Sequence, residues 1–163
     1  MDAVEIRPDP ASFRRVAAAL DDEADGREWR RELAAELHTA LAPGVDAARA
    51  AVLAMPGGLP HAGEPLRQAV AAAVTSEIRL SGASAGARIR ARKRGMPRGF
   101  TNAPKRLNAR RGWRHPVFSP DVWVTQRGEP GWFDDTLRPL RPAMRAAAER
   151  ALQSRAQRIA RRS

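Results

Sequence analysis

The feature that most constrains the fold is a long apolar stripe in the first third of the chain. Its residues recur at steps of three and four, at Trp29, Leu33, Leu37, Leu41, Val45, Ala48, Val52 and Met55. This spacing places them on one side of an α-helix of about 40 Å. An apolar side of that length needs cover from other elements, so the pattern predicts a long helix as the spine of one domain.

Pro43 and Gly44 lie inside the stripe without changing its phase. An interior proline removes one backbone hydrogen bond, and its ring clashes with the carbonyl one turn earlier. We therefore expect a kink or a brief break of the helix near Ala42.

Shorter elements are predicted before the long helix. Val4 to Arg7 has the composition of a short strand, within a segment of residues 1–8 that is the candidate flexible N-terminus. Asp9 and Pro10 are typical of a helix start, because aspartate caps the first turn and proline fits the first helical position. That helix continues through Leu20 and ends at an acidic cluster.

The segment after the long helix predicts a loop and then a hairpin. Met55 to Pro65 is rich in proline and glycine, and Leu66 to Val74 is Ala-rich and helical in character. The chain is then expected to be extended through Ser76 to Ser81 and to turn at Gly82 to Gly86. The next six residues, Ala87 to Arg92, alternate small or apolar residues with arginine, which predicts a strand.

Positive charge is concentrated between Ile78 and Pro120. This block holds twelve Arg or Lys residues and no Asp or Glu, whereas the other 120 residues hold 17 basic and 18 acidic groups. The formal charge of +11 therefore belongs to one block. Such a block must meet phosphates, acidic surfaces of other subunits or water, because its like charges repel one another.

Two parts of this basic block are candidate binding surfaces. The alternation in the predicted strand places Arg88, Arg90 and Arg92 on one solvent-facing side, where they can meet phosphates. Residues 94–112 have no sustained period and are predicted as an extended, irregular basic arm. Long loops of this kind are usually functional or disordered.

The C-terminal third predicts two strands and a helix. The strands are Trp113 to Phe118 and Val122 to Gln126, and the helix is capped by Asp134 or Asp135, with Pro142 in its first turns. Its buried side is marked by Met144, Ala148, Leu152, Ala156 and Ile159. The chain is thus expected to be α+β, a single domain of residues 1–163 with two long helices packed on a small, mostly antiparallel sheet.

The aromatic residues have two interpretations. Trp123, Trp132 and Phe133 are expected in the core where the sheet meets the helices, in preference to stacking on exposed nucleic-acid bases. Phe100 and Trp113 lie in or beside the irregular arm, and they are equally open to a core position and to a role as interface anchors.

No catalytic constellation is evident. There is no Cys, and the histidines, at His38, His61 and His115, lack any metal-binding spacing. Pro56, Gly57 and Gly58 are not followed by the Lys and Ser/Thr of a phosphate loop. We expect no enzyme activity, no cofactor and no metal. The apolar runs fall short of the ~20 residues of a membrane span, and Met1 to Glu5 lacks the order of a secretion signal, so no membrane partner is expected.

Several short motifs occur in a fixed order along the chain. They are Val52 to Pro56 at the end of the long helix, Gly63 to Arg67, Arg98 to Asn108, Gly112 to Phe118, and Gly128 to Phe133 before the last helix. Together they resemble the small neck proteins of long-tailed bacteriophages, which are called tail-completion, minor tail or head-tail connector proteins. The resemblance covers roughly residues 10–162 and is strongest from Met55 to Phe133.

This resemblance implies a structural virion protein, assembled in the host cytoplasm, that forms a ring between the DNA-filled head and the tail. The ring is expected to be a hexamer, with a dodecamer as the alternative. Its implied partners are further copies, the adjacent connector, stopper, tail-terminator or tail-tube rings, and genomic DNA contacted without sequence preference in the channel. Whether the chain is a completion protein, a terminator or a stopper stays open.

A ring joins two dissimilar surfaces of each subunit. The chain offers an acidic surface at Asp21, Asp22, Glu23, Asp25 and Glu28, and a basic arm at Arg98, Phe100, Lys105, Arg106, Arg110, Arg111, Trp113 and Arg114. We expect the arm to contact a neighbouring subunit, and Arg88, Arg90 and Arg92 to face DNA phosphates. The alternative is a free basic nucleic-acid-binding protein, which the pI of about 11.6 favours. No helix-turn-helix, RNP-like strand or zinc finger supports it.

Overall fold

The computed structural model describes residues 4–6, 10–21, 26–56, 66–82, 85–116, 119 and 121–161. Within these ranges the chain is α+β, as expected. Its elements are β1 (Val4–Ile6), α1 (Pro10–Asp21), α2 (Gly26–Ala54), α3 (Leu66–Ala73), β2 (Val74–Arg79), β3 (Gly86–Ala91), α4 (Ala103–Leu107), β4 (Trp113–Pro116), β5 (Trp123–Gln126), α5 (Asp134–Leu137) and α6 (Arg141–Ala160).

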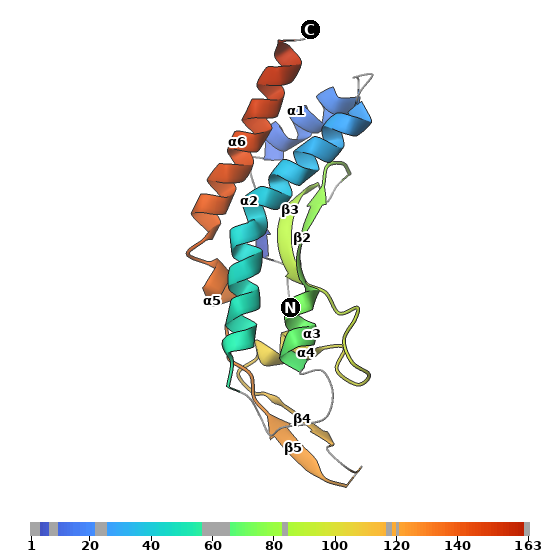
Figure 1. Ribbon diagram of the computed structural model, residues 1–163, viewed down its shortest axis with the longest axis vertical. Helices are drawn as coiled ribbons and strands as arrows, with labels where there is room; N and C mark the ends of the chain where they lie inside the picture. Colours follow the sequence, from blue (N-terminus) through green and yellow to red (C-terminus); the bar gives the residue numbers. More distant parts are fainter. Residues whose placement is uncertain are drawn as a thin grey trace.

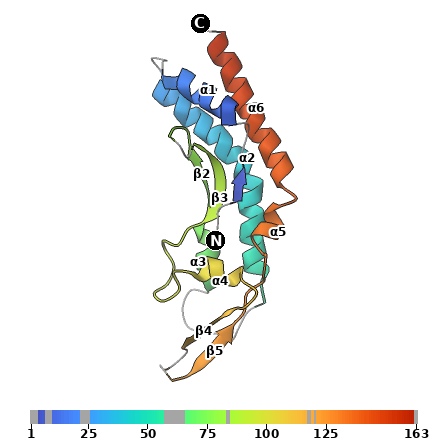
Figure 2. The same ribbon diagram turned by 180° about the vertical axis from the view of Figure 1, so that it is seen from behind.

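The molecule is elongated, and α2 runs along most of its length (Figure 1). This helix lies between α6 on one side and the sheet of β1, β3 and β2 on the other. Seen from behind, α1 and the C-terminal half of α6 occupy one end of the molecule, and the β4–β5 hairpin occupies the opposite end (Figure 2).

The long helix predicted from the apolar stripe is confirmed as α2. Its stripe is buried throughout, and the helix continues through Pro43 without a break, although its axis bends partway along (Figure 1). Gly44 lies at the closest approach of three elements. A Cβ there would lie 2.5 Å from Met144 Sδ on α6 and 2.6 Å from Ile89 Cδ1 on β3. The glycine therefore allows α2 to touch both neighbours.

The three-stranded sheet is antiparallel, with β3 between β1 and β2. On β2 and β3, Val74, Ala87 and Ile89 are buried against the α2 side, and alternate residues lie on the opposite face. This confirms the hairpin predicted from the arginine alternation. The end of α2 is tied to α3 because Arg67 donates a hydrogen bond to the carbonyl of Met55.

The core consists of two apolar clusters. The smaller cluster lies at one end of the molecule and is shared by the helices α1, α2 and α6. Its members are Phe13, Val16, Trp29, Leu33, Leu37, Ala148 and Leu152. Arg155 of α6 is 2 % exposed here, and it binds Glu32 at 2.7 Å and Glu36 at 3.1 Å while its guanidinium lies 5.7 Å from the Trp29 ring. Ala156, which the sequence placed on the buried side, is exposed.

The end of the chain folds as two helices where a single one was expected. Neither Asp134 nor Asp135 caps a helix, so that prediction is wrong: Phe133 is the N-cap residue of α5 and no side-chain cap is present. Asp134 instead accepts a hydrogen bond from Asn108 Nδ2 at 2.8 Å, and Asp135 pairs with Arg138 at 2.6 Å. Pro142 does lie in the first turn of α6, as predicted.

The basic arm of residues 94–112 is not irregular throughout. Ala103, Pro104 and Leu107 are buried on one side of the short helix α4, which the core holds in place. Five residues are too few to show a periodic pattern, which is why the sequence did not reveal this helix. Gly128 lies so close to the backbone of Leu107 that no side chain fits there.

Within the ranges that the structure describes, no helix is both long enough and apolar enough to cross a lipid bilayer.

Candidate functional site

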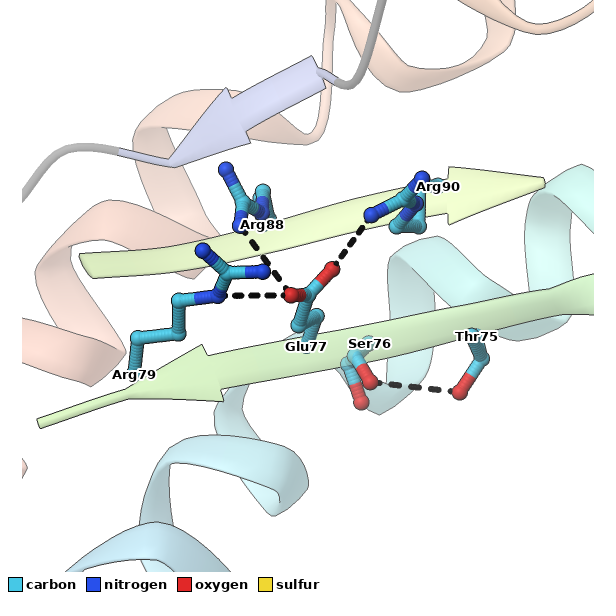
Figure 3. Close-up of polar contacts among 6 residues, drawn as sticks. All are labelled: Thr75, Ser76, Glu77, Arg79, Arg88 and Arg90. Carbon is cyan, nitrogen blue, oxygen red and sulfur yellow. Dashed lines mark hydrogen bonds and ion pairs between the residues drawn. The ribbon is translucent and has the colours of Figure 1, made fainter. Parts of the chain in front are cut away.

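The outer face of the β2–β3 hairpin carries an arginine cluster built around one carboxylate. Glu77 accepts hydrogen bonds from Arg88 at 3.0 Å, from Arg90 at 2.8 Å and from Arg79 at 2.8 Å (Figure 3). The register explains the geometry, because Glu77 lies directly opposite Arg88, and Arg90 is two residues further along β3. We call these four residues the Glu77 cluster.

The charges of the Glu77 cluster do not balance. Hydrogen bonds from Arg88 and Arg90, opposed by partial burial, lower the pKa of Glu77 from 4.5 to about 2, so the carboxylate is ionised at neutral pH. Three guanidinium groups therefore surround one negative charge. The side chains of Arg79 and Arg90 are 47 % and 44 % exposed. An anion in solution can therefore reach these two guanidinium groups.

The third arginine predicted for this face, Arg92, lies one residue beyond the end of β3 and is exposed. Its backbone N–H donates to the carbonyl of Ala73 at 2.9 Å, so its position is fixed by the sheet. The connection to α4 then presents Lys93, Arg94 and Arg98, all exposed. Positive charge thus continues from the sheet face into this connection.

The remaining arm residues divide into buried aromatic and exposed basic groups. Trp113 is 8 % exposed and belongs to the core, so its predicted role as an anchor for a neighbouring subunit is wrong. Phe100 is half-buried and packs edge-on against His115, with ring centroids 5.2 Å apart. Lys105, Arg110, Arg111 and Arg114 are exposed, while Arg106 is half-buried, 5.9 Å from the Trp113 ring.

The β4–β5 hairpin exposes the aromatic residue that was expected in the core. Trp123 is 51 % exposed, flanked by Val122 at 48 % and Val124 at 38 %, whereas Trp132 and Phe133 are buried as predicted. Arg114 lies across the hairpin from Thr125, and its guanidinium is 5.7 Å from the Trp123 ring. The placement of Trp123 in the core is therefore wrong, because no described helix covers the outer end of this two-stranded sheet.

The predicted acidic surface is only partly described. Asp21 is the last residue of α1, and Glu28 is exposed in the first turn of α2. Asp22, Glu23 and Asp25 lie outside the described residues.

The described histidines have structural partners. His38 Nδ1 lies 2.6 Å from Ser76 Oγ, and His115 Nε2 lies 3.0 Å from Gln126 Oε1. Among the residues that the structure describes, no group of three His, Cys, Asp or Glu side chains is placed to hold a metal ion.

Sequence reasoning missed Glu77, the residue that organises the cluster. It lies one position before the acid-free block, so the count of charges excluded it. The signal was present in the alternation of Thr75, Glu77 and Arg79, which places all three on the outer face of a strand paired with Arg88 and Arg90.

Comparisons of the chain with protein-family models, with curated proteins and with solved structures find no match. The geometry of the basic surface and of the hairpin therefore has to support any functional assignment.

Proposed function

We propose that this chain is a structural subunit of the neck of a long-tailed bacteriophage, which forms a ring at the junction of head and tail and presents its basic face to the DNA in the channel. The observation that carries the proposal is the Glu77 cluster with its continuation at Arg92, Lys93 and Arg94, a fixed surface with excess positive charge. The order of short motifs from Val52 to Phe133 supports the same assignment.

The chemistry of this face suits a polyanion that the protein contacts without recognising its sequence. Phosphate contacts from arginine position a duplex but carry no sequence information. The cluster lies on one face of a three-stranded sheet in which β3 pairs with both β1 and β2. The β2–β3 hairpin is therefore not the free two-stranded ribbon that can enter a major groove and reach base edges. Genomic DNA crossing a channel needs contacts of this kind, because every sequence must pass equally well.

Glu77 has a defined part in this proposal. Its carboxylate holds Arg88 and Arg90 at fixed positions and removes one unit of charge from the face. A weaker, ordered positive surface keeps DNA centred without binding it so tightly that it stops moving. We propose no covalent chemistry for this chain.

DNA binding by the purified protein tests the role of the face. The double variant Arg90→Gln/Arg92→Gln should lower the affinity for random-sequence duplex DNA and reduce the magnitude of the slope of log K against log salt by about two. The control is Arg141→Gln/Arg150→Gln, which removes two exposed arginines from α6 and leaves the face intact. Equal losses in the two variants would show that net charge alone binds DNA.

Cryo-electron microscopy of the head-tail junction tests the assignment itself. The chain should be traceable as a ring, with six copies as our expectation, and its β2–β3 face should line the channel. A protein that is missing from purified virions, and that binds DNA tightly as a monomer, would instead be the free nucleic-acid-binding protein of the alternative hypothesis.

A further inference from the structure

We infer that the tip of the β4–β5 hairpin of one copy docks into a groove between α1 and α6 of the next copy. This inference deepens the proposed function, because it names the two surfaces through which a ring would form. It rests on two unusual apolar features at opposite ends of the molecule.

The first feature is the hairpin tip. Val122, Trp123 and Val124 are consecutive and exposed, and together with Leu53 they are the large hydrophobic residues that the described chain leaves exposed. Figures 1 and 2 both show the hairpin extending away from the helices. A protruding tryptophan between two valines is the type of side-chain group that anchors protein interfaces.

The second feature is a groove of about 570 Å³ between α1 and α6. Its walls are mostly apolar, with Val16, Ala19, Leu152, Ala156, Ile159 and Ala160 as the apolar lining residues. Ala156 and Ala160 are exposed although they continue the apolar side of α6. The apolar side of α6 therefore continues beyond the part of the helix that is buried within one copy.

The relative position of the two features decides between a contact within a copy and a contact between copies. The β4–β5 hairpin lies at the opposite end of the elongated molecule from α1 and the C-terminal half of α6 (Figure 2), which line the groove, so a hairpin cannot reach the groove of its own chain. A contact between two different surfaces is heterologous. Repeated around an axis it closes a ring, and without closure it gives a filament.

Charge favours a second copy as the occupant of the groove. The hairpin is bordered by exposed Arg110, Arg111, Arg114 and Arg127, with Asp121 as the acidic residue of the tip. The helix α1 contributes Ala19 to the groove wall and ends at Asp21, and residues 21–25 of the sequence hold four acids, at Asp21, Asp22, Glu23 and Asp25. Glu149 adds a carboxylate to the wall formed by α6, and Arg15 is the basic residue of the lining.

The C-terminal end of α1 strengthens this attraction, because the carbonyl end of a helix carries partial negative charge. DNA fits the tip less well than a protein groove does. A single tryptophan can stack on a base, but the valines on the opposite face of the strand find no partner in a nucleic acid. A groove with two apolar walls can cover Trp123 on one face of the hairpin and Val122 and Val124 on the other.

The absence of cysteine from the chain allows a direct test. Two substitutions, Val122→Cys at the tip and Ala156→Cys in the groove, are introduced into one chain and treated with a mild oxidant or a short bis-maleimide. We expect a ladder of covalent dimers, trimers and higher species on a denaturing gel. Each single-cysteine variant should give little product alone, and an equal mixture of the two should give a dimer and no ladder.

A second pair of variants tests the same contact without cross-linking. Trp123→Ser and Ala156→Arg should each weaken self-association by tenfold or more in sedimentation velocity, and a mixture of the two should restore one-to-one complexes, because each variant supplies the surface that the other has lost. Leu53→Ser and Ala50→Arg, which change exposed residues of α2, are the matched controls and should assemble normally.

The outcomes are distinct. The inference is overturned if the double-cysteine chain gives no ladder, if a control pair of Leu53→Cys with Ala156→Cys gives the same ladder, or if Trp123→Ser weakens DNA binding and leaves self-association unchanged. A ring in the virion neck built through other surfaces contradicts this inference and keeps the proposed function. A ladder from a protein that is missing from virions would support this inference and contradict the proposed function.

Discussion

At the scale of single residues, Glu77 determines how much charge the basic face presents. Because its carboxylate is shared by three arginines, Glu77→Gln raises the charge of the face by one and releases donors that can turn to phosphate. We expect duplex DNA to bind several-fold more tightly, with the magnitude of the salt slope increased by up to about one. Fluorescence anisotropy at several salt concentrations measures both quantities.

The matched control is Glu149→Gln, which makes the same charge change at an exposed pair with Arg145 on α6. If both variants bind DNA equally more tightly, the effect is one of net charge and the Glu77 cluster has no special role.

The same carboxylate gives a prediction about pH. The pKa of Glu77 in the folded chain is lowered from 4.5 to about 2, so its ionisation favours the folded state. That contribution is complete above pH 4.5 and is lost as the pH falls towards 2. In chemical unfolding series between pH 7 and pH 3, the difference in unfolding free energy between the native chain and Glu77→Gln should shrink as the pH falls. A constant difference would contradict this ion-pair account.

At the scale of elements, Arg155 joins α6 to α2. Its side chain is buried while its partners Glu32 and Glu36 are partly exposed, so the carboxylates can regain water when the arginine is removed. Arg155→Met keeps most of the volume but loses both ion pairs and the cation–π contact with Trp29. We expect the unfolding free energy to fall by about 2 kcal/mol, below the cost of breaking a fully buried pair.

Arg158→Met is the matched control, because Arg158 binds the same Glu36 at 2.7 Å but is about half exposed. It should cost about 0.5 kcal/mol or less. Urea denaturation followed by circular dichroism measures both variants, and equal losses would show that burial of Arg155 does not matter.

The junction of α2, α6 and β3 gives a packing prediction. Gly44→Ala places a methyl group against Met144 and Ile89, which must shift, although alanine also favours the helix. We expect a net loss of about 1 to 2 kcal/mol in unfolding free energy. Thermal unfolding measures it, and a gain in stability would show that the Met144 side chain moves aside without cost.

These elements also show how far the sequence predicts the fold. The helix α2 and the β2–β3 hairpin were predictable because their periods of 3.6 and 2 persist over enough residues to be recognised. The helix α4 has five residues and shows no period. Trp123 was misplaced because a strand pattern does not tell whether another layer covers the sheet. Arg155 has partners 119 and 123 residues away, which no local pattern reveals.

At the scale of the whole molecule, the chain combines a basic region in its centre with an acidic run near its beginning. If rings form through contacts between these regions, reversing the acidic charges should weaken assembly in a way that depends on salt. The double variant Asp22→Lys/Glu23→Lys adds four units of positive charge to a chain whose formal charge is already +11. We expect assembly to weaken strongly at low salt, where charges act over about 10 Å or more, and less at high salt, where they are screened.

The control must make the same change in net charge elsewhere, because general repulsion between more basic subunits also weakens assembly. Asp46→Lys/Glu129→Lys does so at two exposed positions, one on α2 and one before α5. Native mass spectrometry over a range of salt concentrations compares the two double variants. A larger and more salt-sensitive loss for Asp22→Lys/Glu23→Lys assigns the effect to a contact made by the acidic run. Equal losses of assembly in the two double variants would assign the effect to net charge. They would contradict an electrostatic contact between subunits at the acidic run.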